Sequence, residues 1–166
     1  MILLKTKEEI ELIRDAGLLL GKTLAEVGRH IRPGVTTAYL NQIGEQFIQD
    51  NGAKPLCKGF EGFPAAFCVS VNDVVVHGIP GDIFIKEGDN VTLDCVIEYN
   101  GYVADSAYTF AVGDVSPEVR RLMKVTREAL YIGLDLCKAG NRVGDVSHAV
   151  QMHCEKNGPA SRLPAG

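Results

Sequence analysis

The sequence has few of the features that mark secreted, membrane-bound or nucleic-acid-binding proteins. No apolar run approaches the roughly 18 residues of a membrane span, and the opening segment 1–9 becomes charged too early for the apolar core of a signal peptide. The formal net charge of -4 leaves no broad basic field, which disfavours nucleic acid as a direct partner. We therefore expect a cytoplasmic protein that associates with neither membranes nor nucleic acid.

Cysteine does not occur in a pattern that would make it structural. The five cysteines are an odd number and include no C-x-x-C pair, so neither a disulfide framework nor a zinc knuckle is indicated. We expect most of them to be small buried hydrophobic residues in a reducing compartment. The remaining composition is that of an ordinary globular protein, 46% hydrophobic and 23% charged over 166 residues, which suffices for one compact domain.

Hydrophobic residues recur at helical spacing in two pairs of segments, one toward each end of the chain. Capping residues mark where these segments begin, and glycines mark where they end. The predicted order is two helices, a β-rich middle and two more helices. The helices are expected at about 6–31, 37–52, 116–140 and 144–157.

The middle of the chain contains short β-prone runs separated by turn signals. The strongest of these signals is Asn100-Gly101, a pair typical of two-residue hairpin loops. We therefore expect a long hairpin, preceded by two shorter strands. The strands are expected at 65–71, 74–79, 91–99 and 102–112.

A weak internal repeat relates the second predicted helix to the fourth. Segment 32–52 aligns with segment 138–158 at an offset of 106 residues. The first copy leads into strands, whereas the second is followed by eight residues that include two prolines. The second unit is therefore expected to lack its sheet. We expect a single domain at 1–158 and an irregular C-terminal tail at 159–166.

The side chains best suited to chemistry lie on the predicted hairpin. If Asn100 and Gly101 form its loop, paired residue numbers sum to 201, and Asp94 and Asp105 project from the same face as diagonal neighbours. Two carboxylates on a partly apolar face repel each other, so one divalent metal ion or a pair of ions would satisfy both. The alternative is that one or both lie near a sheet edge, in water or beside an arginine.

His77 adds a second candidate group, because it ends a β-prone run just before Gly78, where a strand could give way to an active-site loop. A lone histidine after three valines is also typical of a core or turn histidine whose hydrogen bonds are satisfied. His30, His148 and His153 are weaker candidates. The last two are five residues apart, which is not the i, i+4 spacing of two metal ligands on one helical face.

Two longer stretches resemble the signature of type I methionine aminopeptidases. One runs over residues 68–80, and the other joins residues 90–94 to residues 100–113, with eleven positions separating the two aspartates. The resemblance covers residues 3–158. It implies half or more of the α/β (α+β) pita-bread fold shared by creatinases and these aminopeptidases. In that fold, helices pack on one face of a curved antiparallel sheet.

By this resemblance the chain is a metalloaminopeptidase that removes initiator methionine from nascent polypeptides, by attack of metal-activated water on the scissile carbonyl. Asp94 would chelate one divalent ion and Asp105 would bridge two, drawn from Co, Mn, Fe, Zn or Ni. His77 would hydrogen-bond the substrate near the scissile amide and stabilise the transition state. Four residues match the walls of the methionine pocket, although ordinary core packing would also explain each: Cys57, Phe60, Phe63 and Cys68.

The sequence departs from the family pattern in two places. Ala104 stands where a glycine usually precedes the second metal aspartate. Family members also continue past the helix that ends near Gly158, and their later segments supply a histidine and two glutamates with no equivalent here. We therefore expect the 166-residue chain to bind metal weakly and to be inactive alone.

Three functional hypotheses remain open. The chain is a truncated or altered aminopeptidase, a half-enzyme that needs a complementary chain, or a non-catalytic member of the fold that binds peptides or ribosomal components. The combination of His77, Asp94 and Asp105 favours the two enzymatic hypotheses. A sheet meant to be completed by a second half would leave an open edge, so we also expect the chain to dimerise or aggregate through that edge.

Overall fold

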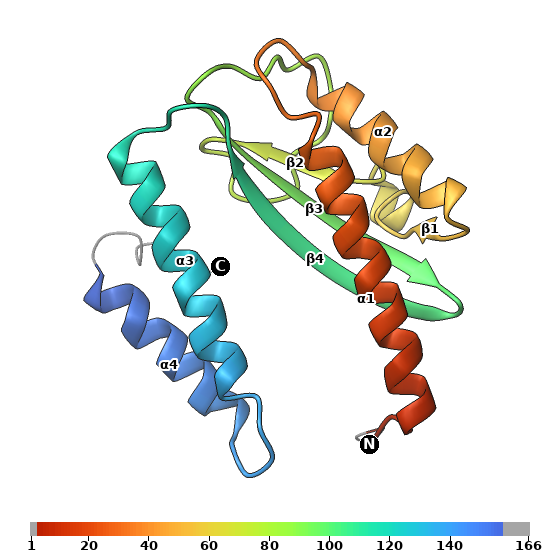
Figure 1. Cartoon of the computed structure of the whole chain (residues 1–166), viewed down its shortest axis with the longest axis vertical. Helices are drawn as coiled ribbons and strands as arrows, with labels where there is room; N and C mark the ends of the chain where they lie inside the picture. The colour runs from red at the N-terminus through yellow and green to blue at the C-terminus, as the bar shows by residue number, and fades with distance from the viewer. Residues whose placement is uncertain (1–2, 158–166) are drawn as a thin grey trace. The chain divides into compact units, whose positions relative to one another are not determined.

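The computed structural model describes residues 3–157, which fall into two compact units that divide between Val115 and Ser116. The first unit contains two α-helices and the sheet, and the second contains two further α-helices (Figure 1). The predicted order of elements is confirmed. The tail predicted at 159–166 lies outside the described residues, and the single domain at 1–158 stays a prediction.

The two helices of the first unit begin where side chains cap them. α1 (Lys7–Gly28) begins after Thr6, whose hydroxyl accepts the Glu9 N–H at 3.2 Å while the Glu9 carboxylate accepts the Thr6 N–H at 2.7 Å. This reciprocal pair satisfies two amides that no helical carbonyl can reach. α2 (Thr37–Asp50) begins after Thr36, whose hydroxyl likewise caps the first turn.

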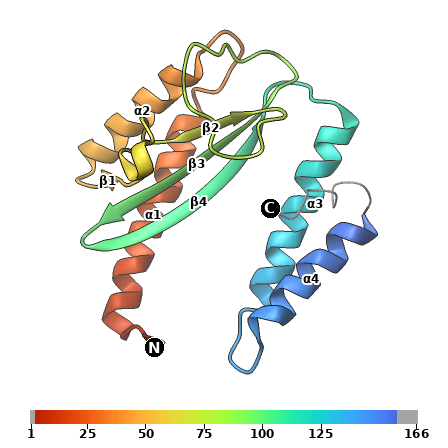
Figure 2. The same cartoon turned by 180° about the vertical axis from the view of Figure 1, so that it is seen from behind.

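The sheet is antiparallel and is built around its third strand. The first and second strands pair with different parts of one edge of the third strand. The fourth strand pairs with the whole length of the other edge. Figures 1 and 2 show α1 and α2 together on one face of this sheet, which leaves the other face free for a site. The strands are β1 (Lys54–Pro55), β2 (Cys68–Val71), β3 (Asn90–Tyr99) and β4 (Tyr102–Ala111).

The register predicted for the hairpin is confirmed. Tyr99 pairs with Tyr102, and the pairing continues without interruption along β3 and β4. Asn100 and Gly101 have φ values of 51° and 79°, as a two-residue type I′ loop requires. The loop therefore fixes which residue of β3 faces which residue of β4.

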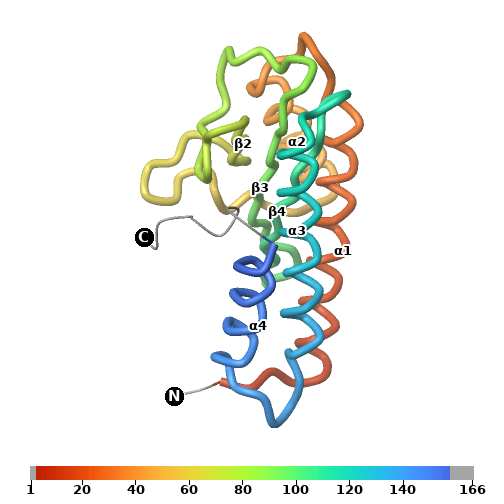
Figure 3. Tube along the Cα trace, turned by 90° about the vertical axis from the view of Figure 1, so that its left-hand side faces the viewer, coloured from red at the N-terminus to blue at the C-terminus, as the bar shows by residue number. Residues whose placement is uncertain are grey.

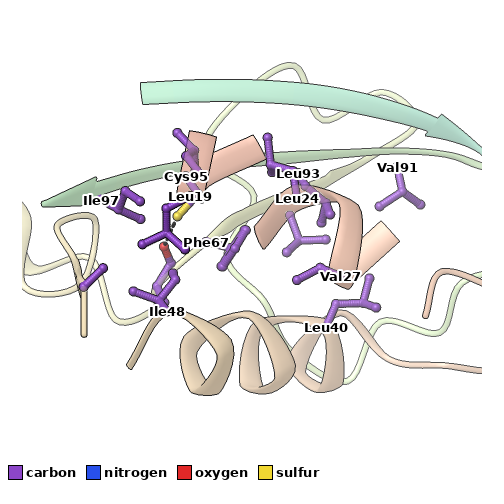
Figure 4. Packing of buried hydrophobic residues seen from close by; sticks show 14 of the residues in the cluster. Leu19, Leu24, Val27, Leu40, Ile48, Phe67, Val91, Leu93, Cys95 and Ile97 are labelled. Atoms are coloured by element: carbon purple, nitrogen blue, oxygen red, sulfur yellow. Dashed lines mark hydrogen bonds between the residues drawn. The ribbon is translucent and has the colours of Figure 1, made fainter. Parts of the chain in front are cut away.

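Alternate residues of β3 form the centre of the core. Leu93, Cys95 and Ile97 are fully buried, and Figure 4 shows them on the side of β3 that faces α2, with Phe67 between. The face of β4 that pairs with these residues is only partly buried, since Tyr108 is 51% exposed. The reason is that β4 is an edge strand of this sheet, with a strand on one side only among residues 3–157.

The strand predicted at 74–79 is wrong, since these residues form a loop between β2 and β3. Val74, Val75 and Val76 are 46%, 65% and 58% exposed, so this β-prone run is not packed against the core. The apolar pattern alone could not show that the chain leaves the sheet after Val71, where β2 ends.

The second unit is a helical hairpin, whose two helices run side by side (Figure 3). α3 (Pro117–Asp135) ends before Gly140, where its end was predicted. The Leu136 N–H donates to the Gly133 carbonyl, three residues back, and Gly140 has a left-handed backbone with φ 97°. α4 (Val143–Lys156) packs against α3 beside Gly133. Among residues 3–157, no helix combines the length and apolar character needed to cross a membrane.

Candidate functional site

A pocket of about 720 Å³ opens on the face of β3 and β4 that points away from the core. Asp94, Val96 and Asp105 contribute to it from the strands, and the chain segments before and after β2 supply its walls. Every residue that the sequence singled out for metal binding, catalysis or substrate contact lines this pocket. These residues are Cys57, Phe60, Phe63, Cys68, His77, Asp94 and Asp105.

The hairpin register places the two carboxylates on one face. Asp94 pairs with Ala107 and Asp105 pairs with Val96, so the two aspartates are diagonal neighbours. Within residues 3–157 neither carboxylate forms a salt bridge or a hydrogen bond with another residue. The alternative that an arginine neutralises them is therefore not supported among these residues, whereas Asp105 does lie exposed on β4, an edge strand among residues 3–157.

The pocket disfavours the ionised form of Asp94. Burial raises the pKa of this carboxyl group, the negative charge of Asp105 raises it further, and His77 lowers it. Such a pair of close, unpaired acids is a favourable place for a cation, because a positive charge relieves both the repulsion and the lost hydration.

Two cysteines lie beside these acids because of strand pairing. Cys68 on β2 pairs with Asp94 on β3, and the residue before Cys57, Leu56, donates its N–H to the Val96 carbonyl at 2.8 Å. Burial raises the pKa of the Cys57 thiol, and it raises the pKa of Cys68 to about 11. Both thiols are therefore neutral at neutral pH and present soft, weakly polar surfaces.

His77 reaches the pocket from the loop between β2 and β3. Its backbone is left-handed, with φ 58°, a conformation that few residues other than glycine adopt. The side chain is exposed and close enough to influence the charge of Asp94. A strained backbone at a residue that lines a pocket is a common mark of a functional position.

The weaker histidine candidates lie elsewhere. His30 faces a separate shallow groove between α1 and α2, where it stands 3.6 Å from the Glu26 carboxylate. His153 on α4 contacts Glu128 on α3 at 3.1 Å, and His148 is exposed on α4. None of the three lines the pocket that holds Asp94.

Several pocket residues were not predicted individually. Val96 could have been found from the hairpin register. Ile79 could have been found from its position two residues after His77 in the sequence. The others come from the irregular segment between β1 and β2, where no periodic pattern indicates which way a side chain points. These unpredicted residues are Leu56, Glu61, Gly62, Pro64, Ile79 and Val96.

The donor set fits a divalent cation only in part. Asp94 and Asp105 offer the carboxylate oxygens that hard divalent ions bind. Within residues 3–157, however, no three side chains of His, Cys, Asp or Glu are arranged to hold a metal ion together. The pocket therefore offers two carboxylates suited to a cation, and a complete metal site would need further donors.

The chain belongs to metallopeptidase family M24, whose family model matches residues 11–166. The family is one of metallopeptidases, which agrees with the paired carboxylates of the pocket. The family that the sequence motifs indicated is therefore confirmed.

Methionine aminopeptidases are among the proteins similar to this chain. The enzyme of Clostridium perfringens is 44% identical over 158 residues, which cover 95% of this chain and 64% of that protein. Methionine aminopeptidase 1 of Bacillus subtilis is 44% identical over 155 residues, which cover 93% of this chain and 62% of that protein. The predicted resemblance is thus confirmed, and the chain spans less than two thirds of the length of these relatives.

Solved structures confirm the fold. The methionine aminopeptidase of Rickettsia prowazekii has a TM-score of 0.92 at 36% identity, and the match covers 94% of this chain and 63% of that one. The prolidase of Pyrococcus furiosus has a TM-score of 0.85 at 24% identity, covering 98% of this chain and 47% of that one. The prolidase supports the fold alone. Both likenesses agree with a pita-bread architecture of an antiparallel sheet with helices.

Proposed function

We propose that this chain carries part of the active site of a methionine aminopeptidase, which removes initiator methionine from nascent polypeptides. The observation that carries the proposal is the convergence of His77, Asp94 and Asp105 on one pocket that also contains two neutral thiols. Nothing in the described residues favours the alternative of a non-catalytic binding protein, because peptide binding alone does not require two unpaired acids.

Asp94 and Asp105 are the residues that would hold the metal. In this proposal Asp94 and Asp105 would together hold the divalent ions, with Co, Mn, Fe, Zn and Ni as the candidates. When bound, such ions supply Lewis acidity and make water a stronger nucleophile at neutral pH. The part played by the chain is to keep the two carboxylates on one face, which the hairpin register does.

His77 would act on the peptide. From its place at the pocket it would hydrogen-bond the substrate beside the scissile amide and stabilise charge that develops in the transition state. Because its side chain is exposed and faces the same pocket as Asp94, it meets an incoming peptide without a change of fold.

The pocket walls would receive the methionine side chain. Cys57 and Cys68 offer polarisable sulfur, and Phe60 and Phe63 offer aromatic surface, both of which favour contact with a thioether. The Phe60 side chain is 69% exposed, so it remains available to close over a bound residue.

The cellular setting follows from this function. Nascent polypeptides emerge at the ribosome in the cytoplasm, so we place the protein in the cytoplasm and regard the ribosome as a partner. The 166 residues contribute two carboxylates to the metal centre. On their own they would bind metal weakly and release no methionine until further donors are supplied.

The first experiment measures metal binding and methionine release by the purified 166-residue chain. Mn²⁺ binding is followed by calorimetry, and release is followed with a Met-Ala-Ser peptide. We expect weak Mn²⁺ binding that Asp94→Asn and Asp105→Asn abolish and that Asp15→Asn, an exposed acid on α1, leaves unchanged. We expect no release of methionine.

Other outcomes would contradict parts of the proposal. Binding that persists in both pocket variants would show that these carboxylates do not form the metal site. Methionine release that depends on Asp94 would confirm the activity but refute the incomplete site, whereas release that does not depend on Asp94 would refute the assigned mechanism.

A further inference from the structure

The loop that carries His77 has no regular secondary structure, but buried side chains hold it through hydrogen bonds. It leaves β2 at Val71 and reaches β3 at Asn90. Its valines are exposed, so apolar burial does not hold this part of the loop. Its position near the pocket must depend on polar contacts just after His77.

The first contact is made by Ser70 on β2. Its side chain is only 3% exposed, and its hydroxyl oxygen accepts the Gly78 N–H at 3.2 Å. The neighbouring Val69 N–H donates to the Gly78 carbonyl at 2.8 Å. A Cβ at position 78 would lie 2.3 Å from the Val69 carbonyl oxygen, so the loop approaches β2 as closely as only glycine permits.

The second contact is made by Thr37 at the start of α2. This residue is fully buried, and its hydroxyl accepts the Gly81 N–H at 2.9 Å and donates to the Gly81 carbonyl at 3.0 Å. The Ala38 N–H donates to the same carbonyl at 3.0 Å. A hydroxyl can donate and accept at once, and the first amides of a helix need partners outside it.

We propose that Ser70 and Thr37 are positioning residues, whose buried hydroxyls fix Gly78 and Gly81 and so hold His77 at the pocket. The two contacts bracket Ile79, which also lines the pocket. With the backbone fixed directly after His77, its left-handed conformation cannot relax without breaking the bond between Gly78 and Ser70. The role of His77 in catalysis rests on the proposed function, whereas the restraint of the loop does not.

The test compares Ser70→Ala and Thr37→Val with a matched control. Thr23→Val removes another fully buried hydroxyl, which bonds the Leu19 carbonyl within α1 at 2.9 Å. Amide hydrogen exchange reports Gly78 and Gly81, and a ¹⁵N order parameter reports His77. Since a lost hydrogen bond of typical strength changes a local equilibrium by about tenfold, we expect ~10-fold faster exchange at Gly78 in Ser70→Ala.

The same increase is expected at Gly81 in Thr37→Val, whereas Thr37→Ser, which keeps the hydroxyl, should stay within about twofold of the parent chain. In both disruptive variants the order parameter of His77 should fall from the rigid range near 0.85 toward 0.6 or less. Thr23→Val should change none of these values beyond what its effect on global unfolding explains. Global unfolding is measured for every variant by denaturant titration.

Two results would overturn the inference. One is unchanged exchange at Gly78 and Gly81 in the disruptive variants. The other is a rise that matches global destabilisation, as expected of a merely structural role. Methionine release, measured in an active preparation, separates the two proposals. If Ser70→Ala loosens the loop but neither Ser70→Ala nor His77→Ala lowers kcat, the role of His77 is refuted and the restraint of the loop still stands.

Discussion

At the scale of single residues, the pocket chemistry depends on one pair of acids. Asp94 and Asp105 were predictable as neighbours because a two-residue loop at Asn100-Gly101 leaves only one register, and that register is observed. The roles of Phe60 and other wall residues rested on family resemblance alone. Cys57, Phe60 and Phe63 lie on the irregular segment between β1 and β2, whose side-chain directions no local pattern encodes.

The raised pKa of Asp94 predicts how stability depends on pH in the metal-free chain. Because the folded pKa lies above the ordinary value of 3.8, the folded state binds this proton more tightly than the unfolded state does. Ionised Asp94 therefore destabilises the fold above its raised pKa, and this cost disappears as the pH falls toward 3.8.

Asp94→Asn removes the ionisation and should stabilise the metal-free chain at pH 7. The carboxyl group is only partly buried, so after allowance for solvent screening we expect a gain of roughly 0.5–1 kcal/mol. Urea unfolding in the presence of a chelator measures it at pH 7 and again near pH 4, where the gain should be smaller. Equal gains at both pH values would contradict the electrostatic explanation.

At the scale of elements, patterns succeeded where a cap or a turn determined the boundary. The first two helices begin close to the predicted residues 6 and 37, since the hydroxyls of Thr6 and Thr36 satisfy the first amides. The prediction failed for 74–79, because β-prone residues say nothing about whether a neighbouring strand is available. It also failed at Gly140, which ends the turn after α3 rather than the helix itself.

The packing of α2 against Phe67, the residue just before β2, provides a prediction at this scale. A Cβ at Gly44 would lie 2.3 Å from the ring of Phe67, which is fully buried. Gly44→Ala should therefore destabilise the first unit by about 1–3 kcal/mol, despite the better helix propensity of alanine. Gly21→Ala in α1 is the matched control, because a Cβ there meets nothing within 4 Å.

The control should stabilise the fold by about 0.5–1 kcal/mol. Thermal or urea unfolding of the two variants beside the parent chain measures both effects. If Gly44→Ala proves neutral or stabilising, Phe67 does not hold α2 against the sheet as closely as described.

At the scale of the whole molecule, the repeat in the sequence predicted that the second unit would lack its sheet. The structure shows α3 and α4 as a hairpin with no strand among residues 116–157, whereas the residues that follow the second copy lie outside the described part of the chain, so this stays a prediction. The pita-bread fold itself was predictable only by resemblance, because the curvature of a sheet depends on packing that no local pattern records. The comparisons with solved structures confirm it.

An open sheet edge is the consequence of this arrangement that can be tested in solution. Among residues 3–157, β4 pairs with β3 alone, so one side of β4 offers unpaired backbone groups to a strand of another molecule. Val103 and Tyr108 on β4 are 48% and 51% exposed, which adds apolar surface. We therefore propose that the chain self-associates through β4.

Light scattering after size exclusion should then show a mass that rises with protein concentration. Val103→Lys places a charge on the edge strand and should shift this association to at least ~10-fold higher concentration, since charged residues on edge strands oppose strand addition. Val143→Lys, at a more exposed apolar residue of α4 that is 84% exposed, is the control and should leave the association unchanged. A monomeric mass at every concentration, or equal effects of the two substitutions, would show that β4 is not the surface through which the molecules meet.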